Sequence, residues 1–292
     1  MTHSCRLAIL AAAVTAALGS SGPALADPST TTSSASGTPS CATPPVLSAI
    51  DATLDRTASR IEARRRLTIV AMGSSSTQGV GASSPAMSYP SRLGQELADR
   101  FPGVDIRVIN HGVSGQDVGE ELIRLDRDVI AEHPDLVIWQ VGTNAVLRRD
   151  DVSADEQLIR RGVAVMKEHG IDVVLMDLQY APRVLARRAS ADMERLIAEI
   201  ALRTYVGLFH RFEIMKEWDR TRQLAPAAMI GPDGLHMTDV SYGCLANQLA
   251  EALAWNWWSH AKLATSPNRS PDAIAGIERS VGVQPTSPAR EP

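Results

Sequence analysis

The chain has 292 residues, enough for one sizeable hydrophobic core or two small ones. Hydrophobic residues make up 44% of it and charged residues 21%, as is ordinary for a soluble globular protein. The formal net charge of −4 makes neither nucleic acid nor an anionic membrane surface an obvious partner. The sequence has no H-E-x-x-H or paired C-x-x-C spacing and no glycine-rich nucleotide fingerprint, so we expect no metal ion and no cofactor.

The first 26 residues have the pattern of a secretory signal peptide. Arg6 precedes an apolar run, 7–18, and Ala24-Leu25-Ala26 supplies an A-x-A cleavage site before Asp27. An uncleaved anchor is the alternative, but the run is too short to span a bilayer comfortably. We therefore expect an exported protein, periplasmic or secreted, whose mature chain begins at Asp27 and has no integral membrane segment.

Low-complexity segments flank the predicted domain. Residues 27–45 and 263–292 are rich in Ser, Thr, Pro and Ala and cannot bury enough apolar surface to order themselves. We interpret them as a disordered linker and a disordered C-terminal tail. They leave a single domain over residues 46–262.

Strands and helices alternate along this domain. A helix over 46–64 leads into the first strand, and the later helices carry apolar residues at helical spacing. Such alternation predicts a parallel sheet with right-handed crossovers, and therefore an α/β fold of three layers, α/β/α, doubly wound. The predicted strands are 66–72, 105–110, 135–141, 172–178 and 206–209, and the predicted helices after the first are 90–101, 116–132, 153–168, 189–204, 212–218 and one beginning at Thr238 or Asp239.

Polar and small residues follow the strands where open α/β sheets place their ligands. Three serines follow the first strand, a glycine the second and an asparagine the third, while an Asp and a His lie three residues apart before the last helix. Acyl transfer by serine needs a hydroxyl, an imidazole, a carboxylate that orients the imidazole, and donors for the oxyanion. The residues that could supply these are Ser74, Ser75, Ser76, Gly115, Asn144, Asp233 and His236.

Four short blocks in this order resemble the SGNH (GDSL-type) hydrolase family over residues 67–253. The blocks are 73–77 (GSSST), 110–115 (NHGVSG), 142–144 (GTN) and 233–236 (DGLH). The resemblance implies a flavodoxin-like sheet of about five parallel strands. It also implies a catalytic triad of Ser75, Asp233 and His236, with an oxyanion hole formed by Ser75, Gly115 and Asn144.

Some positions depart from the family pattern. Ser74 and Ala145 each stand where the family often has Asp, and His111 stands where many members have a smaller residue. His111 either lines the substrate pocket or fills space beside the sheet. We take Ser74, His111 and Tyr180 as candidates for the pocket, whose walls would come from loops 146–153 and 180–188.

The mature chain would keep two cysteines, Cys41 and Cys244, because Cys5 leaves with the signal peptide. In an oxidising compartment they could form a disulfide, and two separate buried thiols are the alternative. We predict the disulfide, which would tie the start of the first helix to the last helix.

The resemblance implies an ester hydrolase acting through an acyl-serine on short acyl, O-acetyl-type esters of small molecules or carbohydrates. Alternatives are a lysophospholipase or thioesterase, and a carbohydrate O-acetyltransferase that uses the same triad. A carbohydrate-binding module without activity would not need the intact triad. We expect a monomer.

Overall fold

The computed structural model describes residues 41–149 and 151–265. The predicted signal peptide, linker residues 27–40 and tail residues 266–292 lie outside the described residues. Within those residues the first helix, α1, begins at Pro45 and the last helix, α13, ends at Thr265.

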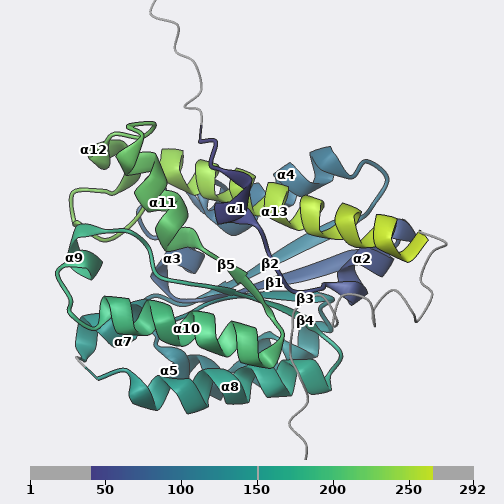
Figure 1. Cartoon of the computed structure of the whole chain (residues 1–292), viewed down its shortest axis with the longest axis horizontal. Coiled ribbons are helices and arrows are strands. Elements are labelled where there is room, and N and C mark those ends of the chain that lie inside the picture. Colours follow the sequence, from purple (N-terminus) through teal and green to yellow (C-terminus); the bar gives the residue numbers. More distant parts are fainter. Residues whose placement is uncertain (1–40, 150, 266–292) are drawn as a thin grey trace, which may run out of the picture. The chain divides into compact units, whose positions relative to one another are not determined.

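The described residues form one five-stranded parallel sheet in the order β2-β1-β3-β4-β5 (Figure 1). This is the flavodoxin-like order, and it confirms the predicted fold class. The central strands are buried along their whole length and are mainly apolar, because both of their faces are covered by helices. The strands are β1 (Leu67–Gly73), β2 (Ile106–Gly112), β3 (Leu136–Gln140), β4 (Asp172–Met176) and β5 (Gly207–Phe209).

Helices cover both faces of the sheet (Figure 1). One face carries α2 (Asp55–Glu62), α4 (Tyr89–Arg100) and α13 (Asp239–Thr265), and the other carries α5 (Val118–Ile123), α8 (Ser153–Glu168) and α10 (Ser190–Thr204). The remaining helical elements are α1 (Pro45–Ser48), α3 (Ser75–Gln78), η1 (Pro85–Met87), α6 (Leu125–Asp128), η2 (Ile130–Glu132), α7 (Thr143–Arg148), α9 (Pro182–Leu185), α11 (Arg211–Arg220) and α12 (Pro226–Met229). None of the described helices is both long and apolar enough to cross a bilayer.

A buried tryptophan fixes how α8 and α5 meet the centre of the sheet. A Cβ added at Gly162 of α8 would lie 2.3 Å from Cη2 of Trp139, so the ring occupies the space that a larger residue would need. The Trp139 Nε1 donates to Oε2 of the buried Glu121 in α5, at 2.7 Å. The indole therefore keeps its polar group satisfied inside the core.

The single helix predicted over 46–64 is wrong. α1 ends at Ser48, Ala49 is extended, and α2 begins only at Asp55. The break has a tertiary cause, because Asn256 of α13 donates from Nδ2 to the carbonyls of Ile50 and Ala52, at 2.9 and 2.8 Å. Those carbonyls accept from a side chain of α13 instead of from a backbone N–H of a continuous helix.

The helix predicted over 116–132 is also not continuous. It begins at Val118 and breaks at Arg124, which leaves α5, α6 and η2 in its place. The buried Arg124 guanidinium donates to the carbonyls of Gly73 and His111, at 3.1 and 2.7 Å, and so anchors this corner to the ends of β1 and β2. Segments predicted as loops contain α7, α9 and α12.

Cys41 and Cys244 are bonded as a disulfide in the structure, with their Cα atoms 5.4 Å apart. That separation is within the usual range for a disulfide. The bridge attaches the segment before α1 to α13.

Candidate active site

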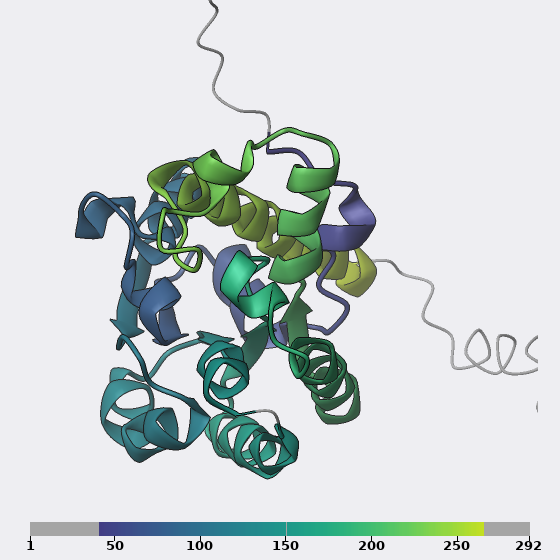
Figure 2. The same cartoon turned by 90° about the vertical axis from the view of Figure 1, so that its left-hand side faces the viewer.

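The carboxyl edge of the sheet brings together the turn after β1 and the loops after β2, β3 and β4 (Figure 2). The turn after β1 is held by Gln140 at the end of β3. Its buried Oε1 accepts hydrogen bonds from Ser74 N and Ser74 Oγ, both at 3.0 Å, and from Ser76 Oγ at 3.1 Å. A Cβ at Gly73 would lie 2.5 Å from Thr77 Oγ1 and 2.9 Å from Gln140 Cβ, so this close approach requires glycine.

The hydroxyl of Ser75, in the same turn, faces the imidazole of His236. Ser75 Oγ lies 3.0 Å from His236 Nε2, and His236 Nδ1 lies 2.5 Å from Asp233 Oδ2. The backbone N–H groups of Leu235 and His236 donate to Asp233 Oδ1, each at 3.0 Å. With Nδ1 donating to the carboxylate, neutral His236 presents its unprotonated Nε2 to the serine hydroxyl.

The Asp233 carboxyl is kept ionised by its hydrogen bonds. Partial burial opposes its charge, but the two backbone donors and the His236 ring lower its pKa to about 2. A carboxylate that is charged at every ordinary pH is suited to stabilise an imidazolium beside it.

The loop with Asp233 and His236 is fixed by backbone pairing. Ile230 and Met237 form an antiparallel bridge, and Gly231 N donates to His236 O at 2.8 Å. Gly234 has φ +69°, in the left-handed region that favours glycine, and its carbonyl accepts from Arg183 N of α9 at 3.0 Å.

The backbone donors predicted for the oxyanion hole come from Ser75 and Gly115. Within the described residues, neither backbone N–H is bonded to an acceptor. Gly115 has φ +83°, and a Cβ added there would meet no atom within 4 Å, so this loop borders open space. Asn144, in the first turn of α7, donates from Nδ2 to Gln116 O at 2.8 Å, which leaves the second amide hydrogen for a ligand.

The loop after β2 is bonded directly to the turn that carries Ser75. Val113 N donates to Gly73 O at 3.0 Å, and Ser114 N donates to Gln78 Oε1 at 2.9 Å. Asn110 Nδ2 donates to Thr77 O at 2.9 Å. These bonds join the segments of the first two sequence blocks.

The three pocket candidates lie in different places. Tyr180 lines a cavity of about 510 Å³, next to Pro232 and Gly234 of the Asp–His loop. Ser74 is buried against Gln140, and His111 Nε2 lies 3.5 Å from Glu132 Oε1, so neither of them lines that cavity. Among the residues described, no group of three or more His, Cys, Asp or Glu side chains could hold a metal ion.

The sequence interpretation missed two glutamines that support the site. Gln140 holds the serine turn, and the buried Gln179 donates from Nε2 to Leu235 O at 3.3 Å and accepts from Thr143 Oγ1 at 3.2 Å. Each is a polar residue at or just after the carboxyl end of an apolar strand. That placement is the signal that could have identified them.

Comparison with protein families gives one match that covers most of the chain. A family model described as "Non-GDSL lipase-like family" matches residues 40–256. An arylesterase of Vibrio mimicus is 32% identical over 95 residues, which are 32% of this chain and 46% of the relative. An acetylxylan esterase of Geobacillus stearothermophilus is 42% identical over 52 residues, 18% of this chain and 24% of the relative. The matches thus span less than half the length of each relative.

Solved structures share the fold. A two-domain esterase (CEX) active on acetylated mannans, co-crystallised with mannopentaose, superposes with a TM-score of 0.59 at 21% identity, over 72% of this chain and 56% of that one. A single-residue variant of Axe2, an acetyl xylan esterase from Geobacillus stearothermophilus, gives a TM-score of 0.55 at 24% identity, over 65% of this chain and 94% of that one.

Proposed function

Because this chain belongs to the non-GDSL lipase-like family, an SGNH-like esterase family, we propose that it hydrolyses carboxylic esters through an acyl-serine at Ser75. The single observation that carries the proposal is the aligned series Ser75 Oγ, His236 Nε2, His236 Nδ1 and Asp233 Oδ2, with separations of 3.0 and 2.5 Å. Ser74 stands in place of the Asp of a GDSL block, and its side chain serves to anchor the turn.

In the proposed first half-reaction, Ser75 Oγ attacks the ester carbonyl while His236 Nε2 takes its proton. Asp233 stabilises the imidazolium through Nδ1. The carbonyl oxygen becomes an oxyanion that would accept from the N–H groups of Ser75 and Gly115 and from the Asn144 amide. Collapse of this intermediate breaks the bond to the alcohol oxygen, which receives the proton from His236.

In the second half-reaction, His236 takes a proton from water, whose oxygen attacks the acyl-serine. A second oxyanion forms in the same hole, and its collapse returns the proton to Ser75 Oγ and releases the carboxylic acid. No residue outside the triad and the oxyanion donors is needed to balance these steps.

We infer that the substrates carry short acyl groups, acetyl to butyryl. The names of the two sequence relatives, an arylesterase and an acetylxylan esterase, support aryl or carbohydrate esters. The cavity beside the Asp–His loop is lined mainly by apolar residues and by Tyr180, and it is a candidate for the alcohol part of such a substrate.

The experiment that tests this function combines a chain-length series with identification of the nucleophile. Acetyl to decanoyl p-nitrophenyl esters and an acetylated xylan are offered to the wild type and to the Ser75→Ala and Ser74→Ala variants. We expect fastest turnover of the acetyl to butyryl esters, loss of turnover only in Ser75→Ala, and fluorophosphonate labelling at Ser75. Faster turnover of a decanoyl ester would refute the acyl preference, and an active Ser75→Ala would refute the mechanism.

We also propose that the protein is exported, on the strength of residues 1–26 alone. Mass spectrometry of the protein recovered from the periplasm or medium of an expressing bacterium should give a chain that starts at Asp27. Recovery of the whole product in the cytoplasm with Met1 retained would contradict export.

A further inference from the structure

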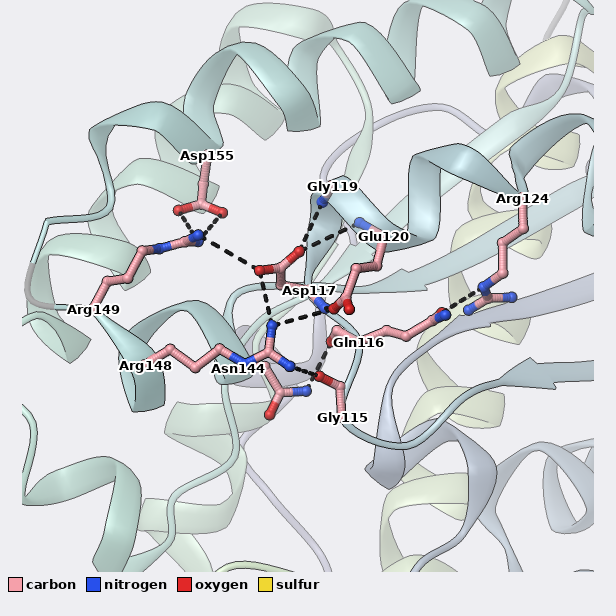
Figure 3. A network of polar contacts seen from close by, with 10 residues as sticks. All are labelled: Gly115, Gln116, Asp117, Gly119, Glu120, Arg124, Asn144, Arg148, Arg149 and Asp155. Carbon is pink, nitrogen blue, oxygen red and sulfur yellow. Dashed lines mark hydrogen bonds and ion pairs between the residues drawn. The ribbon is translucent and has the colours of Figure 1, made fainter.

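One face of α7 binds two consecutive carbonyls of the loop after β2 (Figure 3). Asn144 and Arg148 are four residues apart on this helix and therefore point to the same side. Asn144 Nδ2 donates to Gln116 O at 2.8 Å, and Arg148 Nη2 donates to Gly115 O. α7 thus supplies the Asn144 amide, the side-chain donor of the proposed oxyanion hole. It also holds the loop whose Gly115 N–H is a backbone donor of that hole.

The same guanidinium reaches the start of α5. Arg148 Nη1 lies 3.1 Å from Asp117 Oδ2 and 3.2 Å from Glu120 Oε2. These two carboxylates form the capping box of α5, since Asp117 Oδ1 accepts from Glu120 N and Glu120 Oε2 accepts from Asp117 N. Arg148 therefore connects three fixed points: α7, the carbonyl of Gly115 and the first turn of α5.

Gly115 is the residue of this loop whose backbone has the most freedom, because it has no side chain. The peptide units on its two sides are rigid planes, so the direction of its N–H depends on its two backbone dihedrals. The peptide unit that carries this N–H lies between two anchored units, because Ser114 N donates to Gln78 Oε1 on one side and the carbonyl of Gly115 accepts from Arg148 on the other. Holding both neighbouring units limits rotation of the unit between them. Removal of the fixing group would let the N–H turn away from the oxyanion.

We propose that Arg148 is a positioning residue of the oxyanion hole, which holds the Gly115 N–H in its productive direction. The proposal rests on the esterase function proposed above. Arg148 does not line the cavity that we propose for the substrate, so its removal should weaken the transition state and leave the ground-state complex nearly unchanged.

Arg149 provides a matched control. It follows Arg148 at the same end of α7 and also approaches Asp117, with Nη1 3.5 Å from Oδ2, while its Nη2 binds Asp155 at 3.0 Å. Within the described residues it makes no contact with the carbonyls of Gly115 or Gln116. Its replacement removes the same charge from the same helix end without freeing the loop.

The test measures kcat and KM for p-nitrophenyl acetate in the full-length wild type and in Arg148→Gln, Arg148→Lys and Arg149→Gln. Loss of one oxyanion donor costs about 10²–10³ in kcat, so a donor that is misdirected part of the time should cost about 10–100-fold. We expect this loss in Arg148→Gln, with KM within about two-fold of the wild type. Arg148→Lys should be intermediate, because an ammonium cannot span the three acceptors as a planar fork does. Arg149→Gln should stay close to the wild type.

Amide hydrogen exchange over residues 113–117 separates this proposal from the esterase proposal. Exchange in this segment should be faster in Arg148→Gln than in the wild type or Arg149→Gln, whether or not any ester is hydrolysed. Equal kcat values in the two Gln variants would overturn the role of Arg148. Should Arg148→Gln fail to fold, Arg148→Lys takes its place in both measurements. An inactive wild type whose loop still loosens in Arg148→Gln would count against the esterase function and not against the positioning role.

Discussion

The replacement Glu121→Gln tests how the core beneath the site is charged. Glu121 is 1% exposed, and its Oε2 accepts from Trp139 Nε1 at 2.7 Å. Burial raises the pKa of its carboxyl from 4.5 to about 8, although the Trp139 hydrogen bond and the nearby Arg124 act in the opposite direction. At pH 7 the folded protein therefore holds this group mainly in its protonated form, whereas the unfolded chain holds it ionised.

The sign and size of the effect follow from linkage. A carboxyl whose folded pKa is raised lowers stability as the pH rises above its unfolded pKa, and the loss levels off above the folded pKa. At about 1.4 kcal/mol per pKa unit, Glu121 costs about 1 kcal/mol at pH 5 and about 3 kcal/mol at pH 7. The amide that replaces it in Glu121→Gln would be neutral at every pH and would keep an acceptor for Trp139. The free energy of unfolding of the variant minus that of the wild type should thus rise by about 2 kcal/mol between pH 5 and pH 7.

Urea unfolding at pH 5, 6, 7 and 8, followed by tryptophan fluorescence, measures this difference. All other titrating groups are common to the two proteins, so their contributions cancel in the difference. Glu168→Gln, at an exposed position of α8, is the control for removal of a carboxylate at the surface. A difference between Glu121→Gln and the wild type that stays constant from pH 5 to pH 8 would refute the reasoning.

Four further predictions concern the site and its supports. Asp233→Asn should lower kcat by up to about 10⁴, because the imidazole loses the carboxylate that orients it. Fluorophosphonate should still label the serine slowly, since the imidazole remains within hydrogen-bond distance of Ser75 Oγ. An unchanged kcat would contradict the triad. Asn144→Ala should lower kcat by about 10²–10³ with little change in KM, and a rise in KM alone would show that the amide binds the ground state instead. Ser76→Ala should leave kcat within a few-fold of the wild type but lower the free energy of unfolding by about 1–3 kcal/mol, since the buried Arg211 Nη1 donates to Ser76 Oγ at 2.9 Å; loss of turnover in a folded variant would give Ser76 a catalytic role. The bridge between Cys41 and Cys244 predicts no free thiol in the unfolded, unreduced mature protein and a stability loss of about 2–5 kcal/mol on reduction, and titration of two thiols would exclude it.

The parts of the site that the sequence revealed are those set by strand ends. Parallel strands in one sheet deliver their following residues to a common edge, so Ser75, Gly115 and Asn144 could be grouped without knowing any contact. The pair of Asp233 and His236 could be recognised because the two residues are only three positions apart. On one short loop, that separation lets the carboxylate and the imidazole meet.

The parts that the sequence did not reveal depend on partners far along the chain. Local periodicity cannot show that Asn256 binds the carbonyls at Ile50 and Ala52, or that Arg124 binds those of Gly73 and His111. Both contacts interrupt helices that propensity alone would continue. The contacts of Arg148 could not be predicted either, because the sequence indicated that its segment is a polar loop.

A buried polar cluster adjoins the serine turn and binds the hydroxyl of Ser76. The buried Arg211 donates to Ser76 Oγ and to the carbonyl of Asp177, at 2.9 and 2.5 Å. Burial raises the pKa of Asp177, and burial together with the Asp177 charge raises the pKa of the neighbouring Glu194. Ser76 Oγ accepts a hydrogen bond from Arg211, and Ser74 Oγ donates one to Gln140. Of the three serines in the turn, Ser75 is the one whose Oγ faces the His236 imidazole.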